Sequence, residues 1–298
     1  MRETEIIELI RNFATRAPAN SQLVEGIGDD CAIVRPRSKH DLVFTSDFTI
    51  EDRHFTLVTH SAMDVGYKSL TRSLSDLAAM GAEPVFCLVS LAVPGTLSSN
   101  WTTEFYEGLT SAAGEYKISL AGGDLARTDK VVADVMCCGS VPSGSALLRS
   151  GARPGDHIYV TGLLGYSALG LERQEGDAWL RHKRPVPRLE VGVELRGIAT
   201  AAIDLSDGLS LDLARLCQES RVGAEIQPPL PTAEGASIQQ ALHGGEDYEL
   251  LFTAPPETRM PALISGVPIT RIGEITAGAG TITFGGSPLE PLGFDHFR

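Results

Sequence analysis

The chain has 298 residues, 43% of them hydrophobic and 21% charged, which fits about two soluble globular domains with apolar cores. Its formal net charge of -13 argues against a basic surface that would hold nucleic acid or an anionic membrane. A phosphate ligand would therefore be bound through metal ions, helix N-termini or a few arginines.

Neither the cysteines nor the N-terminal segment indicates secretion. The five cysteines are widely spaced and form no CxxC pair, and four lie in apolar runs, as buried reduced thiols do. Residues 1–13 mix charged and apolar residues at helical spacing and lack the apolar core of a signal peptide. No run approaches the roughly 18 apolar residues of a membrane span. We therefore expect a cytoplasmic protein with no membrane or nucleic-acid partner.

The first half of the chain is predicted to form a mixed sheet with helices. An amphipathic helix is expected at residues 3–14, followed by strands at 31–34 and 42–44. Ser61 is a candidate N-cap for a long helix that ends at Gly81. The next elements are a strand at 85–93, a helix at 98–117 and strands at 118–121 and 130–140. Because several strands follow one another without a helix, we predict an α+β first domain.

The second half begins after a candidate linker at residues 142–145, which places one domain at residues 1–141 and another at 146–298. Its predicted elements are a strand at 157–161, a helix opened by the loop 162–165, a helix at 189–197, a helix opened by 204–207, strands at 224–226 and within 244–253, a helix at 256–265 and a strand at 269–275. Residues 181–188 are the only concentrated basic stretch.

Six aspartates lie at turns or at the ends of predicted elements, several of them beside glycine: Asp30, Asp47, Asp76, Asp124, Asp204 and Asp207. If the strands at 31–34 and 42–44 pair antiparallel, Asp30 and Asp47 lie at one edge of the sheet, where their charges repel unless a cation lies between them. Oxygen ligands without Cys or His clusters favour Mg²⁺ over zinc. Asp and Ser are also ordinary turn and capping residues, so spacing alone leaves a magnesium–phosphate site and structural turns equally open.

The motifs of several common enzyme classes are absent from the sequence, including a P-loop, the HRD and DFG motifs of protein kinases, GxGxxG, GxSxG and HExxH. Nine other segments occur in one order across nearly the whole chain: GDDCA (28–32), TSD (45–47), HF (54–55), SDLAAMG (75–81), GGD (122–124), RSGARPGD (149–156), IDLSDGL (203–209), GGEDYEL (244–250) and GFDHF (293–297). Together they resemble the thiamine-monophosphate kinase family, within the aminoimidazole ribonucleotide synthetase superfamily.

The resemblance implies a two-domain α+β and α/β fold, in which an N-terminal mixed sheet with helices dimerises and a C-terminal α/β domain follows. It implies a homodimer that binds ATP and several Mg²⁺ ions, with K⁺ as a further candidate ion. The implied reaction transfers the γ-phosphate of ATP to thiamine monophosphate. Direct in-line attack by the substrate phosphate needs no strong base, because that oxygen is already an anion.

The resemblance also implies roles for individual residues. The Mg²⁺ ligands would be Asp30, Thr45, Ser46, Asp47, Asp76, Asp124, Asp204 and Asp207. ATP would be bound by Tyr106, Gly123, Asp124, Arg149 and Ser206, and the substrate by His54, Glu246 and Phe294. The residues closest to the transfer would be Asp124, Asp207 and Arg149. Phe294 is suited to stacking on the cationic thiamine rings and Glu246 to answering their charge.

Several of these residues also have ordinary structural interpretations. His54 is equally well explained as a satisfied surface histidine, Phe294 as a packing residue and Arg149 as a solvated side chain. Residues 52–53 and 125–130 depart from the family pattern, mostly on the substrate side. The rival interpretations are an ATP-dependent enzyme of the superfamily with another acceptor, and a non-catalytic dimer that binds metal or nucleotide.

Overall fold

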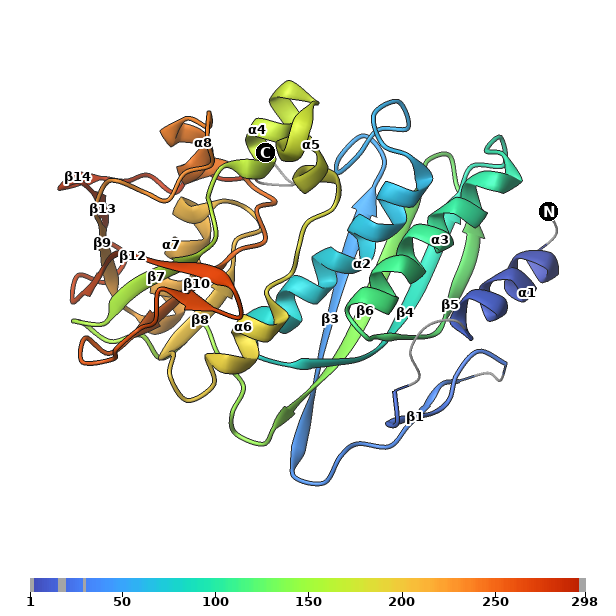
Figure 1. Ribbon diagram of the computed structural model, residues 1–298, viewed down its shortest axis with the longest axis horizontal. Coiled ribbons are helices and arrows are strands. Elements are labelled where there is room, and N and C mark those ends of the chain that lie inside the picture. The colour runs from blue at the N-terminus through green and yellow to red at the C-terminus, as the bar shows by residue number, and fades with distance from the viewer. Residues whose placement is uncertain (1–2, 16–19, 29–30, 295–298) are drawn as a thin grey trace. The chain divides into compact units, whose positions relative to one another are not determined.

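The computed structural model describes residues 3–15, 20–28 and 31–294, coloured along the chain in Figure 1. The chain divides into two compact units, one formed by residues 1–77 and 83–144 and the other by residues 78–82 and 145–298. Among the described helices, none is long and apolar enough to cross a membrane. Four of the cysteines are buried, and Cys31 is exposed.

The first unit is built on a four-stranded sheet in the order β3-β6-β4-β5. Its elements are α1 (Glu3–Ala14), β1 (Leu23–Glu25), β2 (Ile33–Val34), β3 (His40–Ile50), α2 (Ala62–Ala79), β4 (Glu83–Val93), α3 (Ser99–Glu115), β5 (Ser119–Arg127) and β6 (Val132–Pro142). Strands β4 and β5 run parallel, and the other neighbouring pairs run antiparallel. In Figure 1, α2 and α3 lie side by side over one face of this sheet.

Strand β3 shows how the sequence divides the two faces of the sheet. Thr49 is fully buried, and Thr45 and Asp47, which share its face by the two-residue period, are half-buried toward α2. Phe44 and Phe48 alternate with them and are 61% and 55% exposed. One face of the sheet is therefore covered by helices, while the other leaves two large aromatic side chains in solvent.

In this region one condition of the sequence analysis is not met and one expectation is wrong. The strands near 31–34 and 42–44 do not pair with each other, because β2 pairs with β1 and β3 pairs with β6. Asp47 lies inside β3 rather than after its end, because the strand continues through the alternating segment 45–50. Asp30 lies outside the described residues, and the pairing that would have placed it at one sheet edge with Asp47 does not occur.

The second unit contains an eight-stranded sheet, most of it in the order β14-β13-β9-β12-β7-β10-β8, with β11 paired to β12. Its strands are β7 (His157–Thr161), β8 (Ala201–Asp204), β9 (Gly223–Ile226), β10 (Leu250–Ala254), β11 (Leu263–Ile264), β12 (Val267–Thr276), β13 (Ile282–Phe284) and β14 (Ser287–Pro288). Its helices are α4 (Tyr166–Arg173), α5 (Gly176–Lys183), α6 (Leu189–Glu194), α7 (Leu209–Ser220) and α8 (Ile238–His243). Leu209, Leu213 and Leu216 are buried on α7 against this sheet.

The helix expected at 256–265 is wrong. Residues 255–262 are irregular apart from a turn at 256–257, and the strand β11 follows. Pro261 removes a backbone donor from the middle of the expected helix, and its ring conflicts with the preceding turn. Helix α5, in contrast, has no counterpart among the sequence predictions, because its apolar residues are few.

Candidate active site

Polar side chains of α2 contact polar side chains of β3 in the first unit. Lys68, Arg72 and Asp76 follow one another at four-residue intervals on α2 and therefore lie on one face of the helix. The Thr45 hydroxyl donates to Asp76 Oδ2, and Arg72 Nη2 lies 4.0 Å from Asp47 Oδ1. Three predicted ligands, Thr45, Asp47 and Asp76, are thus brought together beside a buried guanidinium.

The electrostatics of Cys137 agree with this placement. Cys137 lies opposite Thr45 on the neighbouring strand β6 and is fully buried. Burial first, and then the nearby carboxylates of Asp47 and Asp76, hold the pKa of the Cys137 thiol well above its usual range. The thiol stays protonated and is a poor metal ligand, so the donors offered here are oxygen atoms.

His54 is fixed by its backbone surroundings. Its Nδ1 accepts the backbone N–H of Ile50 at 2.9 Å, and its own carbonyl oxygen accepts from the buried Lys68 Nζ at 3.2 Å. An imidazole whose Nδ1 accepts carries its proton on Nε2, so the other ring nitrogen is a donor. His54 is therefore held by contacts with Ile50 and Lys68, in the tautomer that carries its proton on Nε2.

Asp124 lies on the opposite, uncovered face of the same sheet. The strand register places it beside Ser90, which is in turn beside Asp134, which pairs with Phe48. These four side chains line an open cavity of about 150 Å³, and Ser46 donates to Asp134 Oδ1 at 2.5 Å. The predicted ligands Ser46 and Asp124 thus share one face, while Thr45, Asp47 and Asp76 lie on the other.

Gly123, the predicted ATP contact beside Asp124, is required by the close packing of β5 on β4. Its φ is +154°, and an added Cβ would lie 1.9 Å from the carbonyl oxygen of Val89. Among residues with predicted ATP contacts, Tyr106 is buried inside the first unit, with 1% of its surface exposed. Arg149 is exposed in the second unit, where its carbonyl oxygen accepts from the Ser220 hydroxyl at 2.8 Å.

In the second unit, the predicted acids lie at the end of strand β8 and in the loop after it. Asp204 is its buried last residue, and Asp207 lies in the loop that precedes α7. The carboxylate of Asp212 accepts the backbone N–H groups of Asp207 and Gly208 at 2.9 and 3.1 Å, which fixes the loop. Burial raises the pKa of Asp212 to about 6. Arg215 Nη1 bridges Asp207 and Asp212 at 2.5 and 2.7 Å, which offsets both charges.

The predicted substrate residues of this unit converge on the same loop. The Glu246 N–H donates to the Ser206 carbonyl oxygen at 2.7 Å, and the Phe294 N–H donates to the Asp207 carbonyl oxygen at 3.2 Å. Phe294 is 43% exposed, and Glu246 holds a left-handed backbone conformation with φ of 65°. Segments nearly 90 residues apart in sequence, around Ser206 and Phe294, therefore form one cluster.

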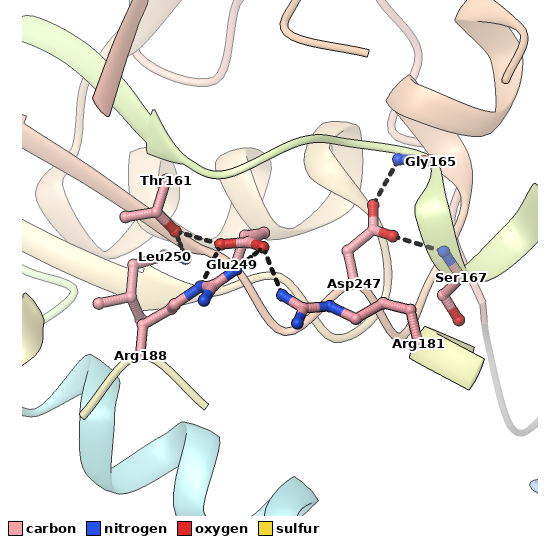
Figure 2. A network of polar contacts seen from close by, with 8 residues as sticks. All are labelled: Thr161, Gly165, Ser167, Arg181, Arg188, Asp247, Glu249 and Leu250. Atoms are coloured by element: carbon pink, nitrogen blue, oxygen red, sulfur yellow. Dashed lines mark hydrogen bonds and ion pairs between the residues drawn. The ribbon is translucent and has the colours of Figure 1, made fainter. Parts of the chain in front are cut away.

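The loop that carries Glu246 is anchored by two buried carboxylates, shown in Figure 2. Asp247 accepts the backbone N–H groups of Gly165 and Ser167 at 2.6 and 2.9 Å, at the start of α4. Burial is the largest effect on Asp247 and raises its pKa to about 7. Glu249, 2% exposed, accepts from Arg188, Arg181 and the Thr161 hydroxyl.

Sequence reasoning missed several residues around these sites: Lys68, Arg72, Asp134, His182 and Glu249. Charged residues in otherwise apolar segments are the signal that could have found Lys68, Arg72 and Asp134. The segment 181–188 is basic, but nothing in its spacing indicates that Arg181 and Arg188 contact the same carboxylate.

Mg²⁺ fits the chemistry of the donors, because the gathered side chains offer carboxylate and hydroxyl oxygens. Within the described ranges, however, no three His, Cys, Asp or Glu side chains are already arranged to hold one ion. Asp47 and Asp76 on the covered face, Asp124 on the open face, and Asp204 and Asp207 in the second unit are the residues that would hold Mg²⁺.

Two protein-family models cover most of the chain. The family described as "AIR synthase related protein, N-terminal domain" matches residues 28–141, and "AIR synthase related protein, C-terminal domain" matches residues 153–285. The thiamine-monophosphate kinase of Salmonella typhimurium (strain LT2) is 39% identical, over 97% of each chain. That of Bacillus subtilis (strain 168) is 35% identical, over 98% of this chain and 99% of the relative.

Solved structures agree with these likenesses. A thiamine-monophosphate kinase from Stenotrophomonas maltophilia K279a superposes with a TM-score of 0.86 at 36% identity, over 97% of this chain and 98% of that one. "AaThiL complexed with AMPPCP and TMP" superposes with a TM-score of 0.81 at 32% identity, over 100% and 99% of the two chains. The predicted two-domain fold class is confirmed.

Proposed function

Because this chain belongs to the AIR synthase related family, and within it to the thiamine-monophosphate kinases, we propose that it phosphorylates thiamine monophosphate with ATP, giving thiamine diphosphate and ADP. The single observation that carries the proposal is the similarity over the full chain to a ThiL protein complexed with AMPPCP and TMP. That protein binds an ATP analogue together with TMP. Because this chain has the same length and fold, we infer that it binds the same two substrates. The enzyme is a transferase of thiamine diphosphate biosynthesis.

The chemistry requires two polyanions to approach each other. The attacking phosphate oxygen of thiamine monophosphate is already charged, so the residues must neutralise repulsion and align the groups rather than remove a proton. Bound Mg²⁺ would supply positive charge between the phosphates. Asp47, Asp76 and Asp124 in the first unit, with Asp204 and Asp207 in the second, would hold these ions. Arg149 would add a guanidinium suited to phosphate oxygens.

We propose that the substrate contacts two kinds of residue: a hydrogen-bond donor for its phosphate, and acidic and aromatic side chains for its cationic rings. His54 has its proton on Nε2 and would donate to the substrate phosphate. Glu246 would face the positively charged thiazolium or the aminopyrimidine donors, and the exposed ring of Phe294 would stack on the flat heterocycles. Residues 52–53, beside His54, form a turn tied by the 2.8 Å ion pair from Lys130 to Asp52.

The uncovered sheet of the first unit is the proposed dimer surface. Phe44 and Phe48 are more than half exposed there, and aromatic side chains on an uncovered sheet face are typical of a protein contact. We assign most of the ATP and Mg²⁺ ligands and this contact to residues 1–141, and most of the substrate contacts to residues 146–298. Sedimentation analysis of the full chain should give twice the monomer mass of 31.7 kDa.

A coupled ADP-release assay tests the function directly. The purified chain, with Mg²⁺ and ATP, is supplied with thiamine monophosphate, with thiamine, or with no acceptor. We expect ADP release that depends on thiamine monophosphate. Release with thiamine as the acceptor would assign a different kinase activity, and binding of ATP without turnover on any acceptor would support a non-catalytic dimer. Repeating the assay with and without K⁺ decides whether that ion is needed.

A further inference from the structure

Glu246 sits in a loop whose backbone is strained on both sides of Asp247. Glu246 and Tyr248 have φ values of 65° and 51°, in the left-handed region that side-chain-bearing residues rarely adopt. Such conformations cost on the order of 1–3 kcal/mol each and persist where the surroundings impose them. The contacts of this loop therefore impose the backbone conformation at Glu246 and Tyr248.

Part of that restraint comes from residues 181–188, which lie outside every motif of the family resemblance. Arg188 donates from Nε to Glu249 Oε2 at 2.6 Å and from Nη2 to Oε1 at 2.5 Å, and Arg181 Nη2 donates to Oε1 at 3.1 Å (Figure 2). Bidentate pairing of a guanidinium with a carboxylate fixes direction as well as distance. The segment 181–188 is thus fixed to Glu249, which follows Glu246 by three positions in the sequence.

His182 lies inside this clamped segment and faces Glu246. It is 3% exposed, and its Nδ1 lies 2.8 Å from the Ser167 hydroxyl and 3.6 Å from Glu246 Oε2. Its ring stacks on Trp179, with centroids 5.2 Å apart and planes 12° apart. An imidazole held on one side by a hydroxyl and over its face by an indole has little freedom to move. It therefore presents a fixed polar atom to the Glu246 carboxylate.

We propose that His182 is a positioning residue for Glu246, and that the clamped segment 181–188 thereby sets the affinity of the enzyme for the cationic part of thiamine monophosphate. The inference rests on the proposed function, in which Glu246 contacts that part of the substrate. His182 acts through Glu246, so its loss should weaken substrate binding without changing how ATP is bound. It should also have no effect once the Glu246 carboxylate is gone.

Two substitutions of His182 distinguish an effect on the orientation of Glu246 from an effect on folding. His182→Leu removes the polar atom, whereas His182→Asn keeps an amide close to the place of Nδ1. His157→Leu is the matched control, since His157 is a partly buried histidine on β7 whose ring contacts Tyr159 rather than Glu246. Thermal unfolding of each full-length variant, followed by circular dichroism, shows which of them keep the wild-type fold.

For the folded variants, kcat and KM are measured separately for thiamine monophosphate and for ATP. We expect His182→Leu to raise the KM for thiamine monophosphate roughly tenfold, a change equivalent to ~1.4 kcal/mol. The KM for ATP and kcat should stay within about threefold of wild type, His182→Asn should recover most of the loss, and His157→Leu should match wild type. Calorimetric titration of thiamine monophosphate without ATP should show the same loss of affinity.

A double-mutant cycle decides whether the effect passes through Glu246. In a Glu246→Gln background, His182→Leu should cause no further rise in the KM for thiamine monophosphate. Additive effects, an equal rise in the KM for ATP, or a folded His182→Leu variant with wild-type affinity would overturn the inference while leaving the proposed function intact. A wild-type enzyme that releases no ADP with thiamine monophosphate would contradict the proposed function, and this inference with it.

Discussion

Arg188 holds the buried carboxylate of Glu249 through two parallel hydrogen bonds, from Nε at 2.6 Å and from Nη2 at 2.5 Å. The two residues lie 61 positions apart in the sequence. The pair joins the segment that follows α5 to the start of β10, beside the cluster of Ser206, Asp207 and Glu246. This bidentate ionic contact therefore lies next to the loop that carries a proposed substrate residue.

We expect Arg188→Met to destabilise the second unit by about 3–5 kcal/mol, because it removes the main partner of a buried charge. Urea unfolding followed through Trp179 measures this, in a Trp101→Phe background that leaves Trp179 as the single tryptophan. The exposed Arg259 provides the control: Arg259→Met should change the free energy of unfolding by less than about 0.5 kcal/mol. Equal stability of the two variants would show that the buried pair adds nothing.

The stability of the second unit should depend on pH through Asp247 and Asp212. Burial raises their pKa values to about 7 and about 6, from 3.8 in both cases. The folded carboxyls bind protons more tightly than the unfolded ones, so this contribution is fully present below pH 3.8 and is lost as the pH rises through about 6 and 7.

The free energy of unfolding should therefore fall between about pH 4 and 7, by up to about 1.4 kcal/mol per pH unit for each group. The same single-tryptophan urea titration, repeated at several pH values, measures the slope. Asp247→Asn cannot titrate at this position, so its slope should be smaller than that of the Asp247 parent. Parallel slopes in parent and variant would mean that Asp247 is ionised throughout this range.

The close packing of α2 on α3 predicts a contrast between two glycines. A Cβ at Gly66 would lie 1.9 Å from the carbonyl oxygen of Phe105, so Gly66→Ala forces the helices apart and should cost about 1–3 kcal/mol or more. Gly114, also helical, has no atom within 4 Å of its added Cβ. Gly114→Ala should stabilise the first unit by about 0.5–1 kcal/mol. The melting temperature, measured by calorimetry, should therefore fall for Gly66→Ala and rise for Gly114→Ala.

Replacement of Asp124 tests the proposed metal site at the open face of the sheet. Asp124 is exposed, so Asp124→Asn should leave thermal unfolding unchanged while lowering kcat by at least about 100-fold. Asp129→Asn, at an exposed turn of the same unit, should keep wild-type turnover. Binding of Mn²⁺, followed by electron paramagnetic resonance, should weaken in the first variant only. Full activity of folded Asp124→Asn would remove Asp124 from the site.

Local patterns predicted the elements of the fold well where the pattern was strong. The β-branched and aromatic run at 157–161 forms β7 at those residues, and the amphipathic segment 3–14 forms α1. The end of β3 was misjudged because Thr, Ser and Asp are common in turns, whereas here they alternate across a sheet that has one polar and one helix-covered side. Pro261 was the available signal against a helix at 256–265.

The candidate site was less predictable from the sequence than the fold was. The order of the motifs indicated the family, but the contacts that orient Glu246 join residues about 60–80 positions apart, such as Arg188 to Glu249 and Asp247 to Ser167. No local spacing encodes such pairs. The division of predicted ligands between the two faces of the first sheet is likewise set by the register of β3, β6, β4 and β5, which only the structure shows.

The most direct test of the account follows the transferred phosphate itself. The enzyme is incubated with Mg²⁺, thiamine monophosphate and ATP labelled in its γ-phosphate, and the products are separated by chromatography. The account predicts that the label appears in the terminal phosphate of thiamine diphosphate, in an amount equal to the ADP formed. Label that appears only in inorganic phosphate, with thiamine monophosphate unchanged, would contradict it.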